Sequence, residues 1–208
     1  IGGYAFQSCS SLASVTIPDS GTSIGDSAFN GSGLTRIVIP EGVTSIGDSA
    51  FYRCSGLTSV TIPGSVKTIG GNVFAYSGLT SVAIPEGVTS IGEYAFDNCT
   101  SLASVTIPST VTTIESSAFI YCASLASVDI PEGVTTIKGS AFSNCGLTSV
   151  TIPGSVTSLE DYAFYYCQNL QTIRFGGTAA EWTALTSGKT DVIPDRATVY
   201  DKDNNPIP

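Results

Sequence analysis

Along most of the chain, apolar and polar residues repeat in one fixed pattern. An Ala-Phe or Val-Phe pair recurs every 22 or 23 residues, at Phe6, Phe29, Phe51, Phe74, Phe96, Phe119, Phe142 and Phe164. Prolines keep the same period, and the one-residue variation falls in the loop between each Phe and the next Leu. A constant period in the twenties is typical of a solenoid, in which each coil stacks only on its neighbours. The pattern therefore predicts eight stacked coils.

Each repeat is described by L-x-x-V-x-I-P-x-x-V-x-x-I-x-x-x-A-F-x-x-C, and residues 57–74 are one instance. The alternation in V-x-I predicts a short strand with one buried face. The Pro that follows ends this strand, because it has no N–H to donate, and the Glu, Gly or Ser residues after it make a turn. A second extended stretch, V-x-x-I, is expected to cross the opposite side. The A-F-x-x-C segment predicts a single turn of helical type that places Phe in the core.

The tail departs from the repeat after residue 170. Phe175 and Gly176 replace the usual Ile-Pro, and Thr178 with Glu181 forms the capping box of a short helix that carries Trp182. Residues 197–200 predict a last strand. We expect residues 1–175 to form the solenoid, entered mid-repeat, and residues 176–208 to form a C-terminal cap of the same domain. Trp182 is then a packing residue of the cap and not a binding residue.

The joint spacing of Leu, Pro, Ala-Phe and Cys resembles that of the BspA-like, Treponema-type leucine-rich repeats, over residues 1 to about 175. With the periodicity, it predicts a mainly β leucine-rich-repeat solenoid. This is a right-handed coil of about eight 22–23 residue repeats with a parallel sheet on one face, short helical turns and a C-terminal cap. The resemblance implies a bacterial cell-surface or secreted protein, since some such proteins take part in adhesion. It implies no shared catalytic residues.

Charge and composition exclude several functions. Charged residues make up 12% of the 208 residues and the net charge is -9, with only eight Lys and Arg, so nucleic acid is not an expected partner. No apolar run reaches the ~18 residues of a membrane span, so no membrane insertion is expected. The chain has no Met and opens with IGGYAF, which we interpret as a fragment or a processed form. Missing export signals therefore leave its location undecided.

Six cysteines share one repeat position, three residues after the Phe, and Ser occupies it in two other coils. They are Cys9, Cys54, Cys99, Cys122, Cys145 and Cys167, with Ser32 and Ser77 as the replacements. Coils stacked about 4.8 Å apart would allow disulfides among the last four, and that pairing stays open. Because Ser substitutes freely, we expect small, buried, unpaired thiols. No Cys-x-x-Cys and no His accompany them, so no metal site is predicted.

The sequence offers little catalytic chemistry. It has no His, no G-x-S-x-G elbow and no phosphate-binding glycine loop. Carboxylates recur at two coil positions, at Asp26, Asp48, Glu93, Glu115 and Asp161 and at Glu41, Glu86 and Glu132, which we interpret as solvated turns and not as a catalytic pair. We therefore predict no enzyme activity and no cofactor.

Binding residues are sought among the outward positions. Those of the V-x-I strands are mostly Ser and Thr, with Arg36 and Arg174 as exceptions. The loop after each Phe is richer in the residues that dominate interfaces, and it gives the candidate binding residues Tyr52, Arg53, Tyr76, Tyr121, Tyr165 and Tyr166. The alternative is that these side chains only shield the core.

These observations predict an extracellular or cell-surface adhesion module, monomeric, that binds a host or neighbouring-cell protein or glycan. The alternative is a structural spacer or stalk with no ligand of its own.

Overall fold

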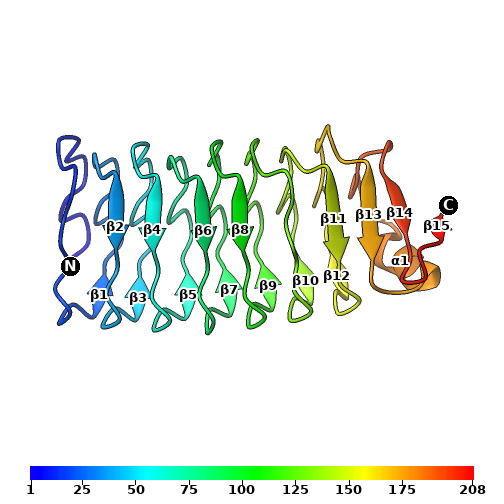
Figure 1. Ribbon diagram of the computed structural model, residues 1–208, viewed down its shortest axis with the longest axis horizontal. Helices are drawn as coiled ribbons and strands as arrows, with labels where there is room; N and C mark the ends of the chain where they lie inside the picture. The colour runs from blue at the N-terminus through cyan, green and yellow to red at the C-terminus, as the bar shows by residue number, and fades with distance from the viewer.

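The computed structural model describes all residues, 1–208, as one elongated stack of coils (Figure 1). The chain starts at one end of the stack and finishes at the other, and strands contact the strands of adjacent coils. We number the coils 1 to 8 by their phenylalanines, from Phe6 to Phe164, and each coil runs from its Phe to the next. The predicted mainly β solenoid of about eight turns is confirmed.

One row of strands is formed by the V-x-I segments, as predicted. It contains β2 (Arg36–Val38), β4 (Ser59–Thr61), β6 (Ser81–Ala83), β8 (Ser104–Thr106), β11 (Ser149–Ile152) and β13 (Thr172–Phe175). Neighbouring strands pair in parallel, with Ile37 opposite Val60 and Val82 opposite Val105. Because successive side chains point to opposite faces, the second residue of each strand turns toward the core and the residues on either side of it face outward.

A second row consists of two-residue strands from the V-x-x-I segments (Figure 1). Its members are β1 (Ser23–Ile24), β3 (Ser45–Ile46), β5 (Thr68–Ile69), β7 (Ser90–Ile91), β9 (Thr113–Ile114), β10 (Thr136–Ile137) and β12 (Ser158–Leu159). The last five form one parallel sheet, and β1 and β3 form another. In every member the Ile or Leu is buried.

The row of V-x-I strands is interrupted between particular coils. No strand pairing joins residues 14–17 of coil 1 to β2, or β4 to β6, and coil 6 is joined to coils 5 and 7 only by single bridges, Thr106 to Asp129 and Asp129 to Thr151. In coils 2, 4 and 7 Leu comes five residues after Phe, whereas six separate them in the other coils, coil 6 included. The two junctions without any pairing therefore precede coils with the shorter loop, and the two bridged junctions precede one coil of each kind.

The phenylalanine segments are tight turns, where the sequence pattern had predicted short helical turns. The N–H groups of Tyr4, Phe6 and Ser8 donate to carbonyls of the next coil, at 2.9, 2.7 and 2.7 Å, while the residues between them bond three positions back in their own coil. Tyr4 and Ser8 achieve this with φ of 60° and 58°, and the equivalent residues of the later coils also have positive φ. A helix would direct every N–H along its own axis, so these turns form a third inter-coil ladder in place of helices.

The core is a single column of phenylalanine rings. Successive rings from Phe6 to Phe164 lie with centroids 5.1 to 5.5 Å apart and planes within 18° of parallel. All except Phe6 are fully buried, because Phe6 lies in the end coil and has a neighbour on one side only. Leu, Ile, Val and Ala side chains of each coil complete the layer.

The cysteines form a second column beside the rings, and all six are free thiols. Five are buried, and each of these five donates its S–H to the carbonyl of a phenylalanine in the preceding coil, as Cys54 does to Phe29 at 3.0 Å. Ser32 and Ser77 lie 3.3 Å from Cys54 and Cys99, which explains why Ser can take this position. The expectation of small, buried, unpaired side chains holds for all but Cys9, which is exposed in the end coil.

Burial raises the pKa of the thiols of Cys54, Cys99, Cys122 and Cys167, to about 12 for Cys99 and about 11 for Cys167. Thiolate is the reactive form, so we expect a thiol reagent at pH 8 to label Cys9 rapidly and the other five only after denaturation. Because the folded pKa of Cys99 lies above the ordinary value of 9.0, this thiol stabilises the fold below about pH 9, and its contribution is lost as the pH rises toward 12. Counting the labelled cysteines by mass spectrometry checks the labelling prediction. Rapid labelling of several thiols in the folded protein would contradict it.

The helix α1 (Ala179–Thr186) takes the place of the second strand in coil 8. Thr178 and Glu181 form the predicted capping box, and the hydrogen bond from the Thr178 N–H lowers the pKa of the Glu181 carboxyl. Trp182 is buried with its ring centroid 5.3 Å from that of Phe175. Its predicted packing role is confirmed. The helix is too short and too polar to cross a membrane.

Two strands follow α1. β14 (Thr198–Tyr200) extends the row of V-x-I strands and pairs in parallel with β13. β15 (Pro206–Ile207) pairs with β14 in the antiparallel sense. The C-terminal end of the solenoid is therefore covered by a strand of different direction and by a helix, whereas the N-terminal end is an ordinary repeat coil.

Candidate functional site

The candidate binding residues lie on the edge formed by the phenylalanine turns, which we call the tyrosine rim. It comprises Tyr52, Arg53, Tyr76, Tyr121, Tyr165 and Tyr166, one or two positions after a core phenylalanine. The Phe and the residue three positions later turn inward, the second residue after Phe is exposed or half-buried in every coil, and the first ranges from buried, as at Ala75, to exposed, as at Tyr165. Tyr76, Tyr121, Tyr165 and Tyr166 are 39–54% exposed, and these are large side chains for a protein surface otherwise rich in Ser and Thr.

Three residues of coils 3 and 4 form one cluster. The guanidinium carbon of Arg53 lies 5.3 Å from the ring centroid of Tyr52 and 5.7 Å from that of Tyr76. The two rings meet edge to face, with centroids 5.6 Å apart. Cation–π contacts at exposed sites contribute about 0.5–1 kcal/mol, so Arg53 is held between the two rings with its N–H groups free to bind a partner.

Asp97 of coil 5 adds a carboxylate to this cluster. The backbone N–H of Tyr76 donates to the carbonyl of Asp97 at 2.7 Å. Burial raises the pKa of the Asp97 carboxyl, and the neighbouring Tyr76 hydroxyl partly opposes this by a hydrogen bond. The Asp97 carboxylate in turn raises the pKa of Tyr76. The cluster thus presents two aromatic rings, a guanidinium group and a carboxylate within two coil spacings.

The remaining rim residues do not join this cluster. Tyr165 and Tyr166 contact each other in coil 8, with ring centroids 5.3 Å apart, and Tyr121 of coil 6 has no aromatic partner. At about 4.8 Å per coil, coil 8 lies roughly 20 Å from coil 4. The structure therefore divides the predicted site into two clusters and one isolated tyrosine.

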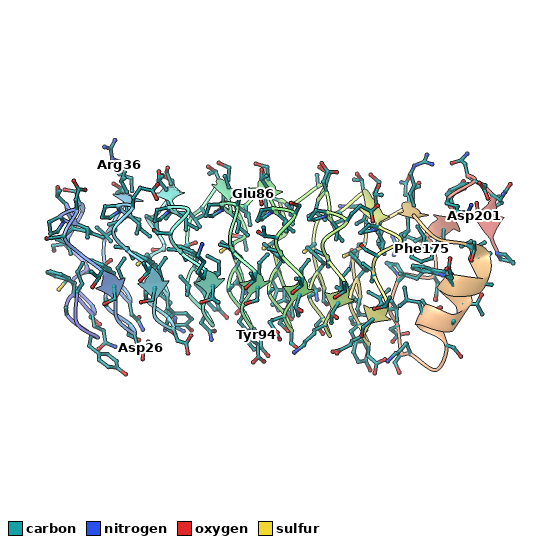
Figure 2. All side chains as sticks on the ribbon, turned by 90° about the horizontal axis from the view of Figure 1, so that it is seen from below. Asp26, Arg36, Glu86, Tyr94, Phe175 and Asp201 are labelled. Carbon is teal, nitrogen blue, oxygen red and sulfur yellow. The ribbon has the colours of Figure 1, made fainter.

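Sequence reasoning missed a second set of rim tyrosines, two positions before the phenylalanine. These are Tyr4, Tyr94 and Tyr162, which are 63%, 37% and 39% exposed, and Tyr94 projects from the stack in Figure 2. Tyr162 packs edge to face on Tyr165 with centroids 5.4 Å apart and so enlarges the cluster of coil 8. The recurrence of Tyr-Ala-Phe in three coils was the available signal.

The two arginines of the strand face differ in their surroundings. Arg174 donates to the side-chain oxygen of Asn204, and its guanidinium lies 5.7 Å from the Tyr200 ring. Arg36 has no ion pair and no hydrogen bond from its side chain.

Comparison with known proteins identifies the same repeat. A model described as the BspA type leucine-rich repeat region matches in six copies, over residues 1–103 and 89–184. The chain belongs to this family. No curated protein matches this BspA-type chain.

Three solved structures are similar to this BspA-type chain. A leucine rich cell surface protein of Faecalibacterium prausnitzii is 36% identical, with a TM-score of 0.63, over 85% of this chain and 57% of the other. A leucine-rich repeat protein of Bacteroides ovatus is 26% identical (TM-score 0.71; 97% and 60%), and that of T. pallidum is 33% identical (TM-score 0.64; 68% and 73%). The chain thus spans less than two thirds of the first two proteins.

Some of the recurrent carboxylates of this BspA-type chain serve the stacking of its coils. Asp26 accepts the N–H of Asp48 at 3.0 Å, and Asp48 accepts that of Gly71 at 2.8 Å. Glu115 forms an ion pair with Lys138 at 2.6 Å. Because each of these three carboxylates bonds to the next coil, the recurrence at their position has a structural explanation. No hydrogen bond or ion pair, in contrast, is formed by the side chains of Glu41, Glu86 and Glu132.

The acidic loop at residues 201–205 is a closed turn. The Asp201 carboxylate accepts the N–H groups of Asp203 and Asn205, at 3.0 and 2.8 Å, and the Asn205 bond lowers its pKa. The carboxylate therefore stabilises its own turn.

Proposed function

We propose that this chain is a cell-surface or secreted binding module that uses its tyrosine rim to bind a protein or glycan of a host or neighbouring cell. The observation that carries the proposal is the cluster of Tyr52, Arg53 and Tyr76, since Tyr and Arg dominate the binding energy of interfaces. The similarity to a leucine rich cell surface protein of Faecalibacterium prausnitzii supports a surface location.

The chemistry of the cluster suits a partner with both apolar and anionic groups. Tyrosine rings offer flat apolar faces for a sugar ring or an aliphatic side chain, and their hydroxyls can hydrogen-bond at the edge of the contact. The Arg53 guanidinium pairs well with a carboxylate or sulfate of the partner. We propose that the module is monomeric and acts without catalysis or a cofactor, with residues 176–208 as a cap of the same domain.

A variant that replaces the cluster by residues of other coils tests the proposal. Tyr52→Asn, Arg53→Ser and Tyr76→Asn place side chains that occupy the same positions in coils 2, 1 and 7 and that tolerate the local backbone. The probes are immobilised mucin, extracellular-matrix proteins and a glycan array. We expect saturable binding by the native chain and a loss of about 30-fold or more in the triple variant, the scale of a hot spot.

Tyr121→Asn is the matched control, because this rim tyrosine lies outside both clusters; it should bind as the native chain does. Equal affinity of the triple variant would overturn the assignment to the cluster.

A structural spacer is the second candidate function. The uninterrupted phenylalanine column and the regular coil spacing would suit a stalk, since each coil is supported along the whole length. If the native chain shows no saturable binding to any of these probes, the spacer becomes the better proposal.

A further inference from the structure

The strand face contains an open cleft between coil 1 and β2. Its volume is about 470 Å³, and it is lined by residues 14–17, Asp19, β2 and Pro40. This volume lies within the range of roughly 300–1,000 Å³ usual for ligand sites. Arg36 of β2 projects from the side of the stack opposite to Tyr94 in Figure 2, so the cleft is separate from the tyrosine rim.

Coils 1 and 2 are joined just before β2, where the N–H of Thr35 donates to the carbonyl of Ala13 at 3.2 Å, but along β2 itself the backbone lacks hydrogen-bond partners on the coil 1 side. The carbonyl of Thr35 and the N–H of Ile39 bond to coil 3, at 3.0 and 3.1 Å. In a parallel ladder, alternate residues direct their N–H and C=O to the same neighbour, so those of Arg36 and Val38 face coil 1. Residues 14–17 of coil 1 supply no partner, because no backbone hydrogen bond involves them. The free edge of β2 therefore offers two donors and two acceptors at strand spacing.

The side chains of β2 also depart from the repeat at this place. In the other coils the outward positions are mostly Ser and Thr, whereas β2 presents Arg36 and Val38. Val38 is 60% exposed and is the only aliphatic residue among the exposed large hydrophobic side chains. Arg36 is an unpaired cation on a chain of net charge -9. A broken sheet, a cleft and an altered side-chain pair thus coincide.

We propose that this cleft binds an extended segment of a partner protein, which adds as a strand to the free edge of β2. Strand addition draws its affinity from main-chain hydrogen bonds and its selectivity from alternate side chains. Arg36 and Val38 lie two residues apart on one face, so the added strand carries an acidic residue next to Arg36 and an apolar residue next to Val38. The recognised pattern is acidic-x-apolar for a parallel strand and apolar-x-acidic for an antiparallel one.

The unliganded protein provides a first test by amide hydrogen exchange. The N–H groups of Arg36 and Val38 should exchange at least about 100-fold faster than those of Ile37 and Ile39, which bond within the ladder. Equal protection of all four amides would show that the β2 edge is already paired and would overturn the proposal.

Binding is then tested with two acetylated and amidated peptides, Thr-Glu-Thr-Val-Thr and Thr-Val-Thr-Glu-Thr, followed by NMR shifts of the β2 amides. We expect saturable shifts with one of them. Two N-methylated forms of that peptide are then compared, one methylated on the odd-numbered residues and the other on the even-numbered residues. Only one form should lose affinity, by at least about tenfold, because only the N–H groups of alternate residues face β2.

Two variants separate side-chain selectivity from main-chain pairing. Arg36→Ser with Val38→Thr installs the residues of coils 3 and 5 and should weaken binding by about threefold to tenfold. The control, Ser104→Arg with Thr106→Val on β8, places the same pair on a strand whose corresponding edge is already paired with β6, and it should gain no binding. The proposal is overturned if neither peptide binds, or if the NMR shifts map to the tyrosine rim. It is also overturned if the two N-methylated forms bind with equal affinity, or if added peptide only causes the protein to self-associate.

Discussion

Replacing Phe119 by alanine is expected to lower the free energy of unfolding by about 3–5 kcal/mol, the usual cost of deleting a buried phenylalanine ring. Phe119 is fully buried, with the rings of Phe96 and Phe142 at 5.1 and 5.2 Å. The substitution leaves a cavity in the middle of the column that neither neighbouring ring can fill, because both are held in their own layers. Denaturant unfolding followed by circular dichroism measures the change.

Phe6→Ala is the matched control at the end of the same column. Phe6 is half-buried and has one stacked neighbour, Phe29 at 5.2 Å, so its loss should cost about half as much or less. In a solenoid, stability is the sum of coil terms and nearest-neighbour terms. The central substitution should therefore also broaden the transition or divide it into two steps. Similar losses for both variants would show that the rings do not act as one column.

Much of this architecture could be predicted because every coil must bury apolar side chains at the same repeat positions. An apolar residue at a fixed position must be buried in every coil, so the phenylalanine column, the strands and their ends at Pro40 or Pro85 follow from the period. The cap was also recognisable, since the pair Thr178 and Glu181 forms a capping box by local hydrogen bonds alone. These features depend on contacts within one coil or between equivalent residues.

Other features depend on how non-equivalent residues of adjacent coils meet, and these were not evident. The turns around Phe6 were expected to be helical, because the pattern does not show that alternate N–H groups bond to the next coil. The tyrosine rim was predicted residue by residue, yet the contact of Arg53 with Tyr76 depends on the spacing and phase of two coils. The free edge of β2 likewise results from a mismatch between neighbours.

Loop length is the sequence feature that could have revealed this mismatch. In the three coils with the shorter loop, Gly directly follows the residue at the cysteine position, at Gly33, Gly78 and Gly146. There the chain crosses closely over the loop of the preceding coil: a Cβ on Gly78 would lie 2.4 Å from the carbonyl oxygen of Ser55. A Gly four residues after Phe and directly before Leu therefore identifies the short loop, and at Gly33 and Gly78 it coincides with an unpaired junction in the row of V-x-I strands.

Gly78→Ala is consequently expected to destabilise the fold by about 1–3 kcal/mol, the usual cost of overpacking against atoms that cannot move aside. The obstructing atom is a backbone oxygen, so relief requires two coils to separate, and the N–H of Thr80 already reaches the carbonyl of Thr58 at 3.4 Å.

Gly56→Ala is the matched control in a coil with the longer loop, where the nearest atom to an added Cβ is the Leu34 oxygen at 3.4 Å. It should be neutral or stabilising by up to about 1 kcal/mol, since alanine restricts the unfolded chain. Thermal and denaturant unfolding of the two variants decides between a steric and a conformational role for this glycine. If both variants lose the same stability, close approach of the coils is not the reason that Gly78 is present, and the link between loop length and the broken strand row fails with it.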